Sequence, residues 1–183
     1  MDYPPEMKVF DLSHGYDPDY IRSFDWGIGK YNEKRRGMYT TDLYADGRNI
    51  HMGIDIWTKT GASVYAFDKG KVMYKQDRDQ AGDYGPTIVT VHQIKGRALY
   101  ALFGHLSKES LQQVTIGQSV VKGETIATIG SQMVNGGWAP HLHFQLTWDD
   151  PGEANMPGVV TEENREEALQ KYPNPLMVLG NIM

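Results

Sequence analysis

Apolar and polar residues alternate along much of the chain, and long stretches with a helical period are scarce. Alternation over about four to eight residues, bounded by glycine-rich turns, is typical of strands with one buried face. The pattern therefore predicts a mainly β protein. The expected strands are residues 49–57, 63–67, 70–76, 87–93, 97–103, 118–121, 124–129 and 141–148.

Two short helices are expected among these strands. Thr161 is a favourable N-cap for a helix over residues 162–171, because its hydroxyl can accept a hydrogen bond from a free backbone N–H of the first turn. Pro173 should end this helix, since the residue before a proline avoids the helical region. Ser107 can likewise cap a turn that runs through Gln112.

The pattern divides the chain into three parts. Residues 1–48 have no clear period and are expected to form an N-terminal extension that wraps the core, residues 49–148 form the β domain, and residues 149–183 form a loop and short helix packed on it. Within the β domain, the glycine-valine pattern of residues 61–72 returns at residues 117–126. Either a duplication of two similar β-units or the ordinary sequence pattern of hairpins would produce this repetition.

Composition narrows the possible functions. A length of 183 residues suits one domain of about 100 to 200 residues. The formal net charge of −5 disfavours nucleic acid as a partner. No apolar stretch approaches the roughly 18 residues of a membrane span, and residues 1–7 hold acids and prolines where a signal peptide would be apolar. The absence of cysteine excludes thiolate nucleophiles and leaves histidines and carboxylates for any transition metal.

The first candidate site is the segment from His51 to Trp57. Because successive side chains of a strand point to opposite faces, His51, Gly53 and Asp55 share one face. The opposite, core-facing side takes the apolar residues Met52, Ile54 and Ile56. An imidazole and a carboxylate should thus point into one cavity, with a glycine that leaves room for a third group.

Two further sites carry histidines. His105 follows an apolar strand, while His141, His143 and Gln145 share one face of a strand whose other face carries leucine and phenylalanine. Neighbouring imidazoles repel each other once protonated, so the pair favours the neutral rings that bind zinc. A His/Asp/His zinc site is the leading hypothesis, against the alternative of ordinary hydrogen-bonded histidines. His14 and His92 are interpreted as structural.

These motifs, in this order, closely resemble the lysostaphin/LytM-type zinc endopeptidases. The resemblance runs over residues 49–146, about half of the chain, and includes the connecting segments 61–66, 83–85 and 117–123. It implies a duplicated hybrid motif fold of barrel-sandwich-like antiparallel sheets. It also implies the following roles: zinc ligands His51, Asp55 and His143, and catalytic histidines His105 and His141.

The chemistry of these residue types agrees with the resemblance. Three protein ligands leave a position on zinc for water, whose pKa can fall to about 7. The glutamate of His-Glu-x-x-His zincins is absent, so His105 and His141 are the candidates for general base. The predicted function is a zinc metalloendopeptidase that hydrolyses amide bonds of short peptides, with peptidoglycan cross-links as the expected substrate.

Three residues depart from the pattern of the family and are candidate substrate contacts. Phe103 stands where many relatives carry tyrosine, and the loop of residues 133–140, with Asn135 and Trp138, replaces a run of small polar residues. Trp138 could line the cleft or pack in the core. The same loop, residues 29–35 and residues 172–175 are similar to a subgroup fused to class-III aminotransferase-type enzymes. That subgroup implies a cytoplasmic location and the wider family an extracytoplasmic one, so the compartment stays open.

Two other interpretations compete with hydrolysis. The N-terminal extension could fill the open zinc position and make the chain a latent or purely binding module. A sugar-phosphotransferase carrier domain would also use paired histidines, but it needs no acid in the first motif, where this chain has Asp55. The sequence predicts no oligomeric state.

Overall fold

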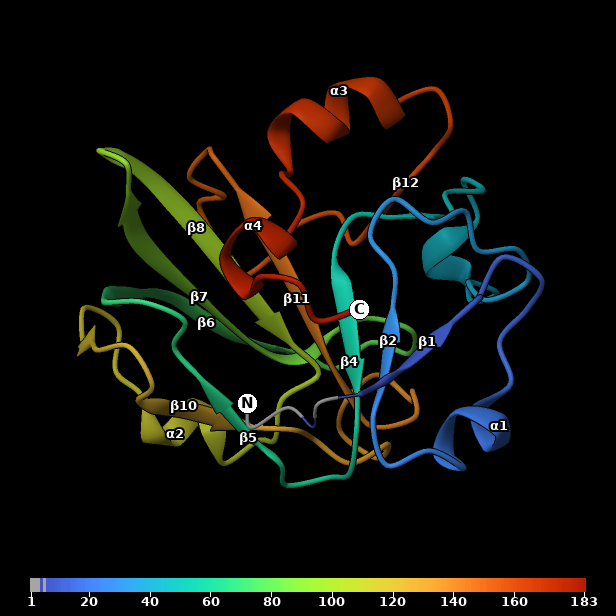
Figure 1. Ribbon diagram of the computed structural model, residues 1–183, viewed down its shortest axis with the longest axis horizontal. Helices are drawn as coiled ribbons and strands as arrows, with labels where there is room; N and C mark the ends of the chain where they lie inside the picture. The colour runs from blue at the N-terminus through green and yellow to red at the C-terminus, as the bar shows by residue number, and fades with distance from the viewer. Residues whose placement is uncertain (1–3, 5) are drawn as a thin grey trace.

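A large twisted sheet forms the body of the computed structural model, which describes residue 4 and residues 6–183 (Figure 1). In this described part the sheet has eight strands, in the order β1 (Lys8–Phe10), β2 (Gly27–Gly29), β4 (Ile54–Trp57), β11 (His141–Thr147), β8 (Arg97–Gly104), β7 (Gly85–Ile94), β6 (Gly70–Arg78) and β9 (Ser119–Val120). Neighbouring strands are antiparallel except for the parallel pair β1 and β2. The expectation of a mainly β protein is confirmed.

Two small ribbons complete the β structure. β5 (Ser63–Tyr65) pairs with β10 (Thr125–Thr128), and β3 (Ile50–His51) pairs with β12 (Val159–Val160). The two segments with the echoing glycine-valine pattern pair with each other, because β5 joins β10 and β6 joins β9. Each segment therefore completes the hydrogen bonding of the other.

The helices are short. They are α1 (Pro18–Arg22), the 3-10 turn η1 (Asp42–Tyr44), α2 (Ser110–Gln113), α3 (Arg165–Lys171) and α4 (Leu176–Leu179). No helix in the described residues has the length and apolarity that a bilayer crossing requires. α3 ends at Lys171 as expected but starts three residues late, because the Thr161 hydroxyl accepts from the N–H of Asn164 in a separate turn.

The prediction of one unbroken strand over residues 49–57 is wrong. The chain bends at Met52 and Gly53, and the two halves, β3 and β4, belong to different sheets. Met52 therefore packs with Tyr84 and Met156, whereas Ile54 and Ile56 enter the main core. The bend is a tertiary effect, since β12 draws β3 away from the main sheet.

The main core lies between one face of the large sheet and the β5–β10 ribbon. Strand β11 runs between β4 and β8 (Figure 1) and sends its apolar side chains into this core: Leu142, Phe144 and Leu146. The alternation predicted for this strand is confirmed, and it leaves His141, His143 and Gln145 on the opposite face. The N-terminal extension adds β1 and β2 to the edge of the sheet beside β4.

Candidate metal centre

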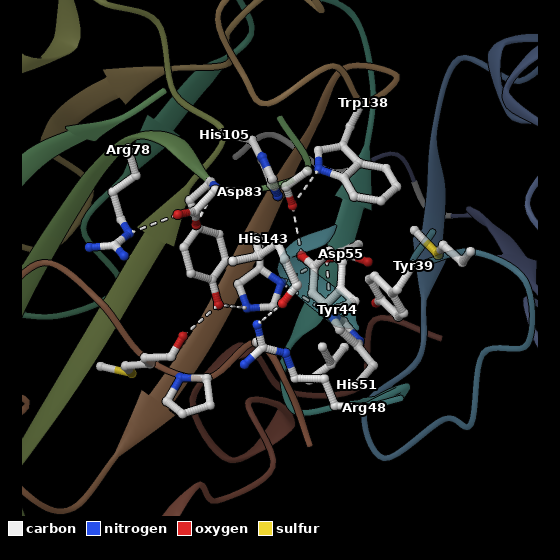
Figure 2. Close-up of a pocket in the computed structure, with 18 of the residues that line it drawn as sticks. Tyr39, Tyr44, Arg48, His51, Asp55, Arg78, Asp83, His105, Trp138 and His143 are labelled. Atoms are coloured by element: carbon white, nitrogen blue, oxygen red, sulfur yellow. Dashed lines mark hydrogen bonds and ion pairs between the residues drawn. The ribbon is translucent and has the colours of Figure 1, made fainter. Parts of the chain in front are cut away.

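His51, Asp55 and His143 meet where β3, β4 and β11 adjoin (Figure 2). Asp55 and His143 are opposite each other in the β4–β11 register. Nδ1 of His143 lies 3.0 Å from both Nε2 of His51 and Oδ1 of Asp55, and the latter two atoms are 3.2 Å apart. A tetrahedral zinc ion with bonds of about 2.0–2.1 Å would space its donors at roughly 3.3 Å. The three buried donors thus fit around one metal ion.

The outer nitrogens of both histidines are held in place. Nδ1 of His51 donates to the carbonyl of Lys30 at 2.9 Å, and Nε2 of His143 donates to Oε1 of Gln145 at 3.0 Å. The amide nitrogen of Gln145 in turn donates to the carbonyl of Pro157 at 3.1 Å, which sets the orientation of that amide. These bonds fix the tautomer of each ring, so that the inner nitrogen keeps a lone pair for a metal.

A buried guanidinium holds the outer oxygen of Asp55. Arg35 donates from Nη1 to Oδ2 of Asp55 at 2.6 Å, and its other partners include Glu33 at 3.1 Å and the hydroxyl of Tyr39 at 3.2 Å. Burial by itself raises the pKa of Asp55, but the neighbouring His51 and Arg35 outweigh it and hold that pKa well below its usual range. Asp55 is therefore an anion with one oxygen, Oδ1, turned to the imidazoles.

His105 and His141 adjoin this group without belonging to it. Their rings are 4.1 Å apart, and each Nδ1 donates to a backbone carbonyl at 2.8 Å, that of Asn135 for His105 and that of Ala139 for His141. Nε2 of His141 lies 3.8 Å from Oδ1 of Asp55. Burial lowers the pKa of His141 to about 4 and the pKa of His105 well below its usual value. Both rings are neutral near pH 7, with Nε2 free to accept a proton.

The remaining histidines lie outside this cluster. The ring of His92 contacts Phe67, and its nitrogens bond to the hydroxyl of Thr90 at 2.7 Å and the carbonyl of Lys69 at 3.0 Å. His14 lies in the loop between β1 and α1. Neither is part of the metal-binding group found among the described residues.

A cavity of about 270 Å³ opens beside the metal centre and is lined by several parts of the chain, including Arg78 and residues 82–84. The N-terminal extension forms one wall, the loop of residues 155–159 another, and Trp138 lies at the upper rim (Figure 2). Trp138 donates from Nε1 to the carbonyl of Gly82 at 3.3 Å. Sequence reasoning missed the cavity-lining residues of the extension: Met38, Tyr39, Leu43, Tyr44 and Arg48.

The three candidate substrate contacts lie in three different environments. Trp138 lines the cavity, so a contact with substrate stays a prediction. The fully buried Asn135 uses its side chain to bond to the backbone of Trp138, and its carbonyl orients His105. Phe103 packs against Phe144 in the main core and does not line this cavity, because alternation along β8 turns it to the other face of the sheet. Its position does not support the expected contact with substrate.

Gly53 provides the space that the ring of His143 occupies. A Cβ at this position would lie 2.6 Å from Cε1 of His143 and 2.8 Å from the carbonyl oxygen of Phe144. We expect Gly53→Ala to displace the ring and weaken metal binding about 10–100-fold, the range seen when the support of a ligand is lost. Competition with a chelating indicator measures this affinity.

Gly117→Ala is the control for that variant. Gly117 has φ of 86°, and an added Cβ would meet no atom within 4 Å, so this variant should cost stability without changing metal affinity. A Gly53→Ala protein that binds metal as tightly as the wild type would contradict the prediction.

Comparisons with known proteins place the chain among metallopeptidases. The family model of peptidase family M23 matches residues 49–167. An uncharacterized metalloprotease of Haemophilus influenzae is 37% identical over 160 residues, and the match covers 78% of this chain and 31% of that protein. The uncharacterized lipoprotein YgeR of Escherichia coli is 36% identical over 104 residues, 57% of this chain and 36% of that protein. The chain spans about a third of the length of these curated relatives.

Two solved structures share the fold. The catalytic domain of the antimicrobial peptidase lysostaphin from Staphylococcus simulans aligns with a TM-score of 0.51 and 22% identity, covering 78% of this chain and 95% of that domain. The catalytic domain of the M23 protein EnpA from Enterococcus faecalis aligns with a TM-score of 0.50 and 21% identity, covering 75% of this chain and 89% of that domain. The family match covers more than half of the chain and includes every histidine and acid of the candidate centre. The chain belongs to peptidase family M23.

Proposed function

We propose that this domain is a zinc metalloendopeptidase that hydrolyses an amide bond in short peptides, with peptidoglycan cross-links as the substrate class. The observation that carries the proposal is the group His51, Asp55 and His143, whose donors lie 3.0–3.2 Å apart. Two imidazoles and one carboxylate are a usual ligand set for a catalytic zinc that keeps a position open. Zinc bound there would supply Lewis acidity and a water of lowered pKa.

The chain itself supplies groups that move a proton. His105 and His141 present a neutral Nε2, and hydrogen bonds from Nδ1 keep each ring in that tautomer. Trp57 stacks on the ring of His141 at 3.9 Å and limits its rotation. We assign His105 and His141 to accepting the proton of the attacking water and to hydrogen bonding with the substrate at the scissile amide.

The substrate class rests on relatives and resemblance. Lysostaphin, which shares the fold, is described as an antimicrobial peptidase, and one relative is a lipoprotein. Both fit the extracytoplasmic action on cell-wall peptides that the family resemblance implies. Similarity to the subgroup fused to aminotransferase-type enzymes stays a prediction, and so does the cytoplasmic location that it implies.

The latent and phosphotransfer alternatives have less support. The described residues of the N-terminal extension contribute Lys30 and Arg35 to the outer atoms of the ligands, and none belongs to the group that could hold a metal. Asp55 lies within that group, which a phosphotransfer carrier would not need.

Hydrolysis is tested by incubating the zinc-loaded protein with purified sacculi and with short peptides that contain glycine or D-amino acids. We expect new amine termini that disappear with a chelator and return with added zinc. Separation of products by chromatography and mass spectrometry identifies the bond. A fully metal-loaded protein that releases no product from any of these substrates would favour a binding domain without turnover.

A further inference from the structure

Two guanidinium groups line the cavity beside the metal centre, and one of them is already neutralised. Arg78 extends from β6 and donates from Nε to Oδ2 of Asp83 at 3.2 Å (Figure 2). Its Nη1 also lies 3.7 Å from Glu153. Glu153 is exposed and contributes little, but the side chain of Asp83 is only 11% exposed, so this pair balances the charge of Arg78.

Arg48, from the N-terminal extension, is oriented mainly by groups that carry no charge. Its Nη2 donates to the carbonyl of Leu43, and its guanidinium lies 5.1 Å from the ring centre of Tyr44. Among the described residues, the acid within ion-pair range is Asp46, at 3.6 Å from Nε and with a side chain that is 55% exposed. Such an exposed pair contributes little. Figure 2 shows the guanidinium of Arg48 directed inward, toward His143.

The acids that line the cavity cannot neutralise Arg48. Asp55 is bonded to Arg35 and to the imidazoles. Asp83 is bonded to Arg78 and to the backbone N–H of Tyr84. A metal ion at the centre would add further positive charge to the same space. The cavity is therefore suited to a ligand with a negative group.

The geometry of the group favours a carboxylate. A guanidinium presents its donors as a planar fork that matches the two oxygens of a carboxylate. Arg48 and the histidines share one cavity of about 270 Å³, so a carboxylate at Arg48 and an amide at the metal centre would belong to neighbouring parts of one small ligand.

We propose that Arg48 binds a carboxylate of the substrate, and that the preferred substrate is a short peptide with a carboxylate next to the scissile amide. The carboxylate is either a side chain of the residue after the scissile bond, which keeps the endopeptidase activity proposed above, or the free terminus of the peptide, in which case the same centre would act as a carboxypeptidase. This inference rests on the proposed function, because it assigns the substrate of the same centre.

Matched peptides test the inference. Acetyl-Lys-D-Ala-D-Ala as the free acid and as the C-terminal amide differ only in the terminal charge, and acetyl-Lys-D-Ala-D-Glu amide moves the carboxylate to a side chain. We expect one carboxylate peptide to have a KM about 10–100-fold below that of the uncharged amide, the range for a hydrogen bond between charged groups. A preference for the free acid would identify the peptide terminus as the source of the carboxylate, and a preference for the D-Glu amide would identify a side chain.

Variants assign that preference to Arg48. In Arg48→Gln the KM of the acid should rise to that of the amide with kcat little changed, and Arg48→Lys should restore part of the difference. Arg78→Gln, a change in the same cavity, should keep the preference. Equal KM values in the wild type, or a preference that survives in Arg48→Gln, would overturn the inference.

Calorimetric binding separates this inference from the proposed function. If none of the peptides is hydrolysed, their binding to the zinc-loaded protein is compared by titration. Tighter binding of an acid than of the amide, lost in Arg48→Gln, would support the carboxylate site while the proposed hydrolysis fails. Equal binding of the acids and the amide would overturn the carboxylate site as well.

Discussion

His143→Ala is expected to remove the metal from the domain. Nδ1 of His143 lies 3.0 Å from both other donors, so its loss leaves one imidazole and one carboxylate, too few for a stable zinc site. The affinity for zinc should fall by more than about 100-fold. Losing only the hydrogen-bond partner of a ligand already costs up to about that factor, and here the ligand itself is lost. Metal analysis after dialysis and competition with a chelating indicator measure the loss.

His92→Ala is the matched control for this variant. His92 is buried like His143 but bonds to Thr90 and Lys69, away from the metal-binding group, so its replacement should leave the metal content unchanged. If His143→Ala keeps the metal content of the wild type, the assignment of the three ligands is wrong.

His141→Ala is expected to keep the metal and lose turnover. The ring of His141 stands beside the three donors, with its Nε2 3.8 Å from Asp55, and its replacement leaves all three ligands in place. Loss of a general base or a positioned hydrogen bond costs about 10²–10⁴-fold in rate. The measurement is kcat together with metal content in the same preparation.

His143→Ala provides the contrast, because it should lose metal and activity together. Equal loss of zinc in the His141 and His143 variants would show that the roles of the two histidines are misassigned. Full activity in metal-loaded His141→Ala would remove His141 from the proton transfer.

The sequence pattern was sufficient to predict strand β11 and the face of the sheet on which each of its side chains lies. Strict alternation put His141 and His143 on a polar face and Leu142 and Phe144 in the core, and the structure has this arrangement. The mainly β class followed from the same period. These are local properties, since the direction of a side chain in a strand depends on its place in the alternation.

Two other expectations about the elements failed, one for a long-range reason and one for a local reason. Nothing in residues 49–57 signals that β12 pairs with His51 and bends the chain at Gly53. For Phe103, the tyrosine of many relatives suggested a contact with substrate, which stays a prediction, although the alternation of its own strand turns the side chain toward the core. The start of α3 was misplaced because Thr161 caps a turn before the helix.

By itself the sequence determined the residue types of the centre and the strands that carry them, because ligand chemistry and strand alternation are set by neighbours in the chain. Only the tertiary structure decided which groups surround them. Arg35 and Arg48 come from a segment without a period, and their charges reach Asp55 and the cavity through contacts between distant parts of the chain. A buried charge needs a partner, and that partner is chosen by the packing of the whole domain.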